Sequence, residues 1–299
     1  MRADINFKNY TDSDYEALCS FLITLNEKDD SHINWNWARL EWMIEHPEFD
    51  KSLKNSIGLW TVGDKIVGAA IYDMYFGEGF CGVLPEYKDL YKAVLEYACK
   101  ELKDDSGFEM AICDENADEI EMAKSLGFTL SDQEEIIMEK RLDDSKGAKL
   151  PGGLKFFCPD PVENAYELQW LFWQGFDHGE DKAEFERDEE IVPRVRKHCN
   201  KDLGVAAVNE KGEMVACCLL WYMAGTDYVY VEPVCTIPAY RGNGVAKAVI
   251  HEALGRAKTL GARRAYVISD MEFYERLGFR KKHHYSFFWK KDPYGTNAN

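Results

Sequence analysis

Residues 241–244 (Arg-Gly-Asn-Gly) form a turn that follows an apolar strand pattern and directly precedes a helical pattern. The amide N–H groups at the start of a helix lack partners inside the helix and carry the positive end of its dipole, so they attract anions. Gly242 and Gly244 let the chain bend sharply and bring its backbone close to a ligand. The residue types and their spacing therefore predict a phosphate-binding turn.

Three kinds of phosphate-binding turn can be compared with residues 241–246. A Walker-type loop requires Gly-x-x-x-x-Gly-Lys-Ser/Thr, which does not occur in the chain. A dinucleotide fingerprint requires Gly or Ala three residues after its second glycine, where Lys247 stands. The third pattern, Arg/Gln-x-x-Gly-x-Gly/Ala after a strand and a proline, is met by Arg241, Gly244 and Ala246.

This third pattern resembles the acetyl-CoA loop of the GNAT N-acetyltransferase family, and a second signature of that family occurs at 273–279 (Phe-Tyr-Glu-Arg-Leu-Gly-Phe). The resemblance implies that acetyl-CoA is the co-substrate. Its pyrophosphate would bind the backbone of a turn shaped by Arg241 and continuing through Gly242, Asn243, Gly244, Val245 and Ala246. Its pantetheine arm would pair with the backbone of Val234, Cys235 and Thr236.

The same resemblance implies direct transfer of an acetyl group to a primary amine. Tyr274 is the predicted general acid, because a phenol with a pKa of about 10 can protonate the departing thiolate at close range; the alternative is a tyrosine that only packs under the cofactor. Glu232 is the predicted general base, although a carboxylate deprotonates an ammonium poorly unless its surroundings raise its pKa; it could instead face solvent or pair with an arginine.

Cys235 as a nucleophile is less favoured than direct transfer. The weaker candidates His178, Asp270, His283 and His284 receive no role.

One departure from the family concerns the connection between the strand at 265–268 and the helix that carries Tyr274. In the family this connection is commonly longer and contains an asparagine, whereas here it is short and has none. The cofactor contacts that this asparagine usually makes are therefore not expected.

An internal repeat divides the chain into two copies of one fold. Four matches occur in the same order at offsets between 148 and 155, ending with Leu-Gly-Phe at 126–128 and 277–279. The first copy has lost both turn glycines, places Asp89 where a phosphate would lie, and has Ala123 in the position of Tyr274. The prediction is an α/β (α+β) protein of two tandem GNAT-like domains, a degenerate one at 1–145 and an acetyl-CoA-binding one at 150–299. Each has a central mixed β-sheet flanked by helices, and a linker lies at 143–153.

Composition limits the partners. The net charge of −17 argues against nucleic acid or an anionic membrane surface as the main partner. Nine scattered cysteines without a Cys-x-x-Cys pair, and an N-terminus without signal-peptide features, favour reduced thiols in the cytoplasm and no metal.

The acceptor is the least determined part of the prediction. The acidic run at 177–190 has eight Asp/Glu. In the family the first helices of the domain wall the acceptor pocket, so this run could favour a cationic small-molecule amine. It could equally be a solvated helix face. The alternative function is a non-catalytic, CoA-binding regulatory or sensor protein, and the oligomeric state is not predicted.

Overall fold

The computed structural model describes residues 4–143, 148–188, 197–198 and 200–292. The chain forms two compact units. The second unit comprises Met138–Val267 and Met271–Arg280, and the remainder of the chain forms the first. Parts of the expected linker (144–147) and of the acidic run (189–190) lie outside the described residues. Within the described residues, no helix has the length and apolar character needed to cross a membrane.

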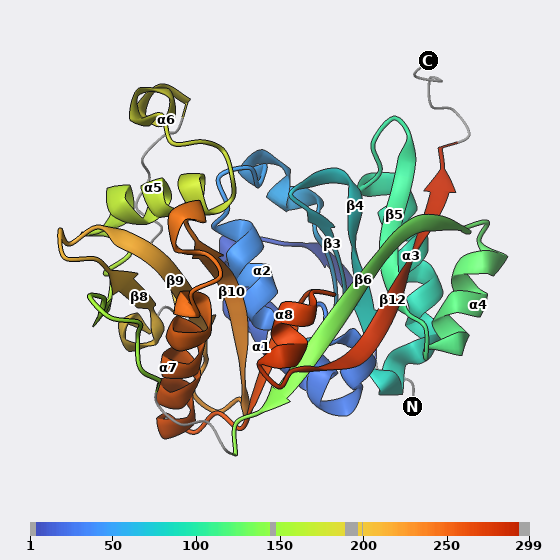
Figure 1. Ribbon diagram of the computed structural model, residues 1–299. Helices are drawn as coiled ribbons and strands as arrows, with labels where there is room; N and C mark the ends of the chain where they lie inside the picture. The colour runs from blue at the N-terminus through green and yellow to red at the C-terminus, as the bar shows by residue number, and fades with distance from the viewer. Residues whose placement is uncertain (1–3, 144–147, 189–196, 199, 293–299) are drawn as a thin grey trace. The chain divides into compact units, whose positions relative to one another are not determined.

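The two halves of the chain repeat one order of secondary-structure elements, which confirms the predicted tandem α/β arrangement (Figure 1). The first half runs through β1 (Asn6–Asn9), α1 (Tyr15–Lys28), α2 (Trp37–Ile44), β2 (Gly58–Val62), β3 (Lys65–Asp73), β4 (Tyr75–Val83), α3 (Tyr91–Glu101), β5 (Gly107–Cys113), α4 (Ala117–Ser125) and β6 (Thr129–Arg141). The second half runs through β7 (Lys155–Phe157), α5 (Ala165–Gly175), α6 (Lys182–Asp188), β8 (Val205–Val208), β9 (Met214–Trp221), β10 (Tyr228–Thr236), α7 (Val245–Thr259), β11 (Arg264–Ile268), α8 (Glu272–Arg276) and β12 (Arg280–Lys291).

The last strand of the second half, β12, lies almost entirely in the first unit, and β6, the last strand of the first half, has residues in both units. In the first unit the strand order is β1-β2-β3-β4-β5-β12-β6, and in the second it is β6-β11-β10-β9-β8-β7. The C-terminal strand β12 therefore pairs with β5, in a register from Tyr285↔Cys113 to Lys291↔Gly107. This corrects the expected domain boundary, which placed all residues from 150 onward in one domain. A repeat identifies equivalent strands, but an equivalent strand can pair in either copy, so the sequence pattern alone does not determine the partner.

The first unit contains one strand that the sequence analysis does not predict. β4 has glycines at 77, 79 and 82, which weaken a strand pattern. It nevertheless pairs with β3 over most of its length. The glycine at 79 is required by a close approach, since a Cβ there would lie 2.2 Å from the carbonyl oxygen of Ile71.

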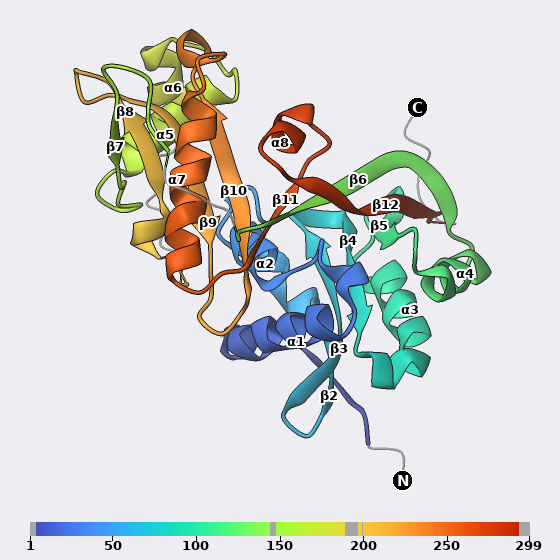
Figure 2. The same cartoon turned by 60° about the horizontal axis from the view of Figure 1, so that its bottom comes forward.

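In the second unit, α5 and α7 pack against strands β8–β10 (Figure 2). α7 turns an apolar face toward the strands, with Val245, Val249 and Ala253 buried at helical spacing. α5 contributes Leu171 to a cluster of small and apolar side chains that fixes the helix to the middle of the sheet. Its buried members are Leu171, Ala206, Cys217, Leu219 and Cys235.

Candidate active site

Strand β10 changes its neighbours halfway along its length. Among the described residues, its parallel ladder with β11 runs only from Tyr228↔Arg264 to Tyr230↔Tyr266. Its antiparallel ladder with β9 continues to Thr236, with a register shift between Val231 and Val234 that makes Glu232 and Pro233 a bulge. The predicted pantetheine-binding residues, 234–236, thus lie on a part of β10 that β11 does not border. An edge of this kind can accept an extended ligand through strand-like hydrogen bonds.

A short 3-10 helix (Pro238–Tyr240) follows β10 and leads into the glycine turn, which ends where α7 begins. Gly242 and Gly244 have φ values of +76° and +79°, in the left-handed region that favours glycine. Gly244 is the N-cap of α7 and no side chain caps the helix. The helix bond at this end runs from the Ala248 amide to the Gly244 carbonyl (3.1 Å). The preceding amides, including those of Val245 and Ala246, are therefore available to an acceptor outside the helix.

Arg241 connects the turn to two other elements of the second unit. Its Nε donates to the backbone oxygen of Thr236 (2.9 Å) and its Nη2 to that of Gly175 (2.9 Å). Its Nη1 donates to Oδ2 of Asp177 (3.1 Å), a residue with φ +65° just beyond α5. These contacts fit a side chain that shapes the turn. Sequence reasoning misses the role of Asp177, because no spacing signal links residues 64 positions apart.

Tyr274 lies on α8 and is 8% exposed, with its ring edge-on to Phe279. Burial raises the pKa of Tyr274 above its ordinary value, and interactions with Cys218 and Glu232 raise it further. The phenol is therefore protonated at neutral pH, and Glu232 is near enough for its charge to act on it. Glu232 is half-buried at the bulge, where its backbone oxygen accepts a hydrogen bond from Nε1 of Trp221 (2.8 Å). The structure thus brings the two predicted catalytic residues into one electrostatic environment.

Cys235 is buried among apolar side chains. Its Sγ lies 3.8 Å from Sγ of Cys217 and 3.9 Å from the carbonyl oxygen of Leu171. Hydrogen bonding to Cys217 and burial raise the pKa of the Cys235 thiol well above its ordinary value. Because the thiolate is the reactive form, this environment disfavours Cys235 as a nucleophile and leaves its backbone as the part that can contact a ligand.

The acidic side chains of α6 make local contacts. Glu186 accepts a hydrogen bond from the Tyr166 hydroxyl (2.5 Å), and Asp188 pairs with Arg187 (2.6 Å). Asp177, at the start of the acidic run, is bound to Arg241. These contacts favour a solvated helix face over a wall that binds a cationic acceptor.

Comparison with known proteins finds a family similarity in the second half of the chain. Residues 162–279 match the model of the Acetyltransferase (GNAT) family. This stretch, about two fifths of the chain, is therefore similar in sequence to GNAT acetyltransferases. The GNAT match begins before α5 and ends at Phe279, so it includes the part of β10 beyond β11, the glycine turn and Tyr274, and it excludes β12.

Solved structures extend the similarity to both halves. The chain is similar to a tandem GNAT protein from the clavulanic acid biosynthesis pathway, with 13% identity over 96% of this chain and 98% of that one and a TM-score of 0.64. It is also similar to a GCN5-related N-acetyltransferase from Sphaerobacter thermophilus (15% identity, 96% and 95% covered, TM-score 0.58). A GNAT acetyltransferase from Colwellia psychrerythraea gives 13% identity, 97% and 100% covered, and a TM-score of 0.55. At these identities the similarity shows the fold, an arrangement of two GNAT-like domains.

Proposed function

We propose that the second unit transfers the acetyl group of acetyl-CoA directly to a primary amine of a small molecule. The observation that carries this proposal is the course of β10. This strand leaves the β11 ladder after Tyr230, passes Glu232 in the environment of Tyr274, and leads through a short 3-10 helix to the glycine turn. One strand therefore connects the elements needed for pantetheine, pyrophosphate and proton transfer.

Acetyl-CoA would be held mainly by backbone groups. The amides of residues 242–246 lie at a helix start, where the helix dipole adds to their attraction for a pyrophosphate. Residues 234–236 offer backbone groups on the part of β10 that lies beyond the end of the β11 ladder. Arg241 binds Thr236, Gly175 and Asp177, and so keeps the turn and the end of β10 in a fixed relation.

In the proposed reaction, Glu232 first removes a proton from the acceptor ammonium, directly or through water. The neutral amine attacks the thioester carbonyl, a C–N bond forms, and the C–S bond then breaks. Tyr274 gives its proton to the departing sulfur, and the nitrogen loses a second proton to solvent. Glu232 then releases its proton to solvent, and Tyr274 is reprotonated from solvent. The net change converts an ammonium and acetyl-CoA into an acetamide, free CoA thiol and one proton.

The position of Glu232 links the two proton transfers. While Glu232 is ionised, its charge helps to raise the pKa of Tyr274. Once Glu232 has accepted the proton of the amine, that contribution disappears and the phenol becomes a better acid. The acid is therefore strengthened after the base has acted, which is when the thiolate must be protonated.

The test is release of free CoA thiol from acetyl-CoA across a panel of primary amines, preceded by thermal denaturation with and without acetyl-CoA. Binding to the folded chain should raise the melting temperature, because a ligand that binds only the native state stabilises it. At least one amine should then release thiol faster than the reaction without enzyme. A melting shift without turnover on any amine would favour a CoA-binding regulatory protein, and no melting shift at saturating acetyl-CoA would contradict the cofactor proposal itself.

A further inference from the structure

The C-terminal end of β5 and the N-terminal part of β12 bring several metal-binding residue types together in the first unit. Tyr285 pairs with Cys113, and the Asp114 amide donates to the His284 carbonyl (3.0 Å). Because side chains alternate between the two faces of a sheet, Cys113, Glu115 and His283 fall on one face. Asp114 and His284 fall on the other, where His284 Nδ1 lies 2.7 Å from Asp114 Oδ2.

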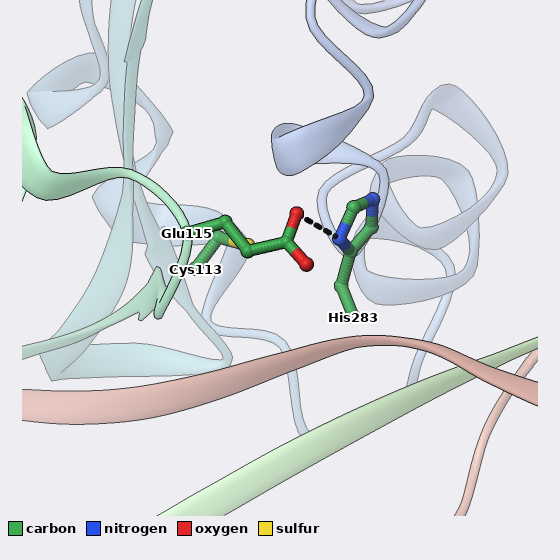
Figure 3. A group of neighbouring side chains, drawn as sticks. All are labelled: Cys113, Glu115 and His283. Carbon is green, nitrogen blue, oxygen red and sulfur yellow. Dashed lines mark ion pairs between the residues drawn. The ribbon is translucent and has the colours of Figure 1, made fainter.

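The first face gathers a thiol, a carboxylate and an imidazole. One potential ligand atom from each of Cys113, Glu115 and His283 lies within 4.8 Å of the other two. Figure 3 shows the Glu115 carboxylate directed at the ring of His283, and Oε2 of Glu115 lies 3.3 Å from Nδ1 of that ring. His283 is 6% exposed, yet neither of its ring nitrogens makes a hydrogen bond to any described residue. A buried imidazole in this state has an unmet requirement for a partner.

Asp30 lies on the opposite side of the His283 ring. Its Oδ1 is 3.4 Å from Nε2 of His283, and its Oδ2 is 2.7 Å from Nζ of Lys282. A carboxylate in this position favours the tautomer with the proton on Nε2, which leaves the lone pair of Nδ1 directed at Glu115. Metal-binding histidines commonly have this arrangement, with a carboxylate orienting the ring through its other nitrogen.

We propose that Cys113 Sγ, Glu115 Oε2 and His283 Nδ1 bind a Zn²⁺ ion, with Asp30 orienting the histidine. Thiolate, imidazole and carboxylate together suit zinc, which accepts all three. Ligand atoms of a tetrahedral zinc site lie about 3.3–3.8 Å apart, so the cluster needs only a small adjustment of side chains. Such an ion would connect β12, which comes from the second half of the chain, to the end of β5.

Zinc binding at this cluster releases a proton. The Cys113 thiol loses its proton to solvent as the sulfur–zinc bond forms, and no oxidant or reductant is involved. Zinc therefore competes with a proton at Cys113, and the affinity should increase with pH over the neutral range.

The neighbouring His284 shows why the proposal concerns one face only. Its two carboxylate partners lie at different ring nitrogens, Asp114 at Nδ1 (2.7 Å) and Glu134 at Nε2 (3.1 Å). A single ion cannot bind both nitrogens of one imidazole, so these groups do not form one ligand set. His284 is therefore a matched control on the same strand.

The test uses the full chain, stripped of metal with a chelator and then titrated with Zn²⁺ alone. We expect one Zn²⁺ per chain, measured by calorimetry and by elemental analysis after dialysis, and a higher melting temperature with zinc. Cys113→Ser, His283→Asn and Glu115→Gln should each lose this binding. Glu115→Gln is the most informative of the three, because its side chain is exposed and its replacement disturbs folding least. Asp30→Asn should lower the affinity about 10–100-fold, as loss of an orienting partner does in other metal sites.

The controls are His284→Gln and Cys158→Ser, the latter removing an exposed cysteine in the other unit; both should bind Zn²⁺ like the wild type. Substitution with Co²⁺ should give a thiolate-to-cobalt charge-transfer band that Cys113→Ser lacks. Absence of bound zinc, or equal binding by Glu115→Gln and the wild type, would overturn the proposal in favour of a histidine held between two carboxylates. These measurements do not involve acetyl-CoA, so their outcome is independent of the proposed enzymatic function.

Discussion

The helix starts of α3 and α7 occupy the same place in the two halves of the chain but differ in what they can bind. In the first half, a 3-10 helix (Pro85–Leu90) runs directly into α3, and Leu90 at the N-cap has right-handed helical dihedrals. In the second half, the corresponding 3-10 helix ends at Tyr240 and two glycines with positive φ precede α7. The length and backbone dihedrals of one turn therefore determine whether the amides at a helix start are open to a ligand. At α7 they are open, whereas at α3 the preceding 3-10 helix continues directly into the helix.

Charge strengthens this difference. A cavity of about 490 Å³ lies beside the start of α3, at the position equivalent to the proposed cofactor site. Its lining includes one lysine, Lys88, and the carboxylates Asp29, Asp89, Asp118, Glu119 and Glu121. A lining of this sign repels a pyrophosphate, whereas the start of α7 has Arg241 and Lys247 nearby in sequence.

The largest expected effect is the presence of a site in one unit and its absence in the other. Calorimetric titration of the full chain with acetyl-CoA should give one site per chain. The acidic cavity of the first unit is expected to contribute none, and Asp89→Asn should leave the stoichiometry unchanged. Two sites of similar affinity would show that the turn and the charges of the first half do not prevent binding.

The second comparison is between Tyr274 and its counterpart Ala123. Tyr274→Phe removes only the hydroxyl, so acetyl-CoA should still bind, and kcat should fall about 10²–10⁴-fold, the usual range for loss of a general acid. Tyr222→Phe is the control, since the Tyr222 hydroxyl donates to the Leu260 carbonyl away from the glycine turn (2.9 Å). An unchanged kcat in Tyr274→Phe would mean that the phenol only packs under the cofactor.

The third comparison uses two glycines with similar dihedrals. At both Gly244 (φ +79°) and Gly127 (φ +89°), an added Cβ would have no atom of the described residues within 4 Å. Valine at either position should lower the free energy of unfolding by about 1–2 kcal/mol, because its side chain disfavours a left-handed backbone. Gly244→Val should weaken acetyl-CoA binding about tenfold because the turn amides move, whereas Gly127→Val should lower only the melting temperature. Equal affinities in the two variants would argue that the turn does not hold the cofactor.

Features whose signal lies within one segment of the chain can be predicted from the sequence, whereas features that depend on distant residues cannot. The position of the turn before α7 agrees with prediction, because glycine and proline signals and helical periodicity lie within one segment. β4 was missed because its glycines serve packing against β3, which a single segment does not reveal.

Pairing between residues far apart in the chain is the second feature that the sequence does not predict. The pairing of β12 with β5, and the bond of Arg241 to Asp177, join residues far apart in the chain. The repeat indicated which elements are equivalent, but which copy each last strand joins is decided by tertiary contacts.

A smaller effect concerns the interiors of the two helices. Gly255 lies within α7 with nothing within 4 Å of an added Cβ, and the corresponding position of α3 is Lys100. Gly255→Ala should raise the free energy of unfolding by about 0.5–1 kcal/mol, because glycine loses more backbone entropy in a helix. Lys100→Ala on α3, an exposed site, should change it by a few tenths at most. Urea denaturation measures both, and a loss of stability in Gly255→Ala would indicate a contact at α7 that only glycine permits.

The smallest effect concerns how β12, a strand of the second half, is held in the first unit. Hydrogen bonds to Glu134 and then to Asp114 raise the pKa of His284 above its ordinary value. The folded state therefore binds this proton more tightly than the unfolded state, so the stabilisation is complete below the unfolded pKa of about 6.5 and is lost as pH rises through the higher folded value. The loss of stability in His284→Gln should accordingly be larger near pH 6 than near pH 9. The carboxylates of Asp114 and Glu134 are ionised at both pH values.

Ser286→Ala provides the control for this pH dependence. Its hydroxyl donates to the same carboxylate, Asp114 (2.7 Å), but does not titrate in this range. Urea midpoints for this variant should therefore differ from those of the wild type by a similar amount at both pH values. A pH-independent loss in His284→Gln as well would mean that its ring holds β12 by packing and neutral hydrogen bonds, and that the charge of the histidine contributes nothing to keeping the second half's last strand in the first unit.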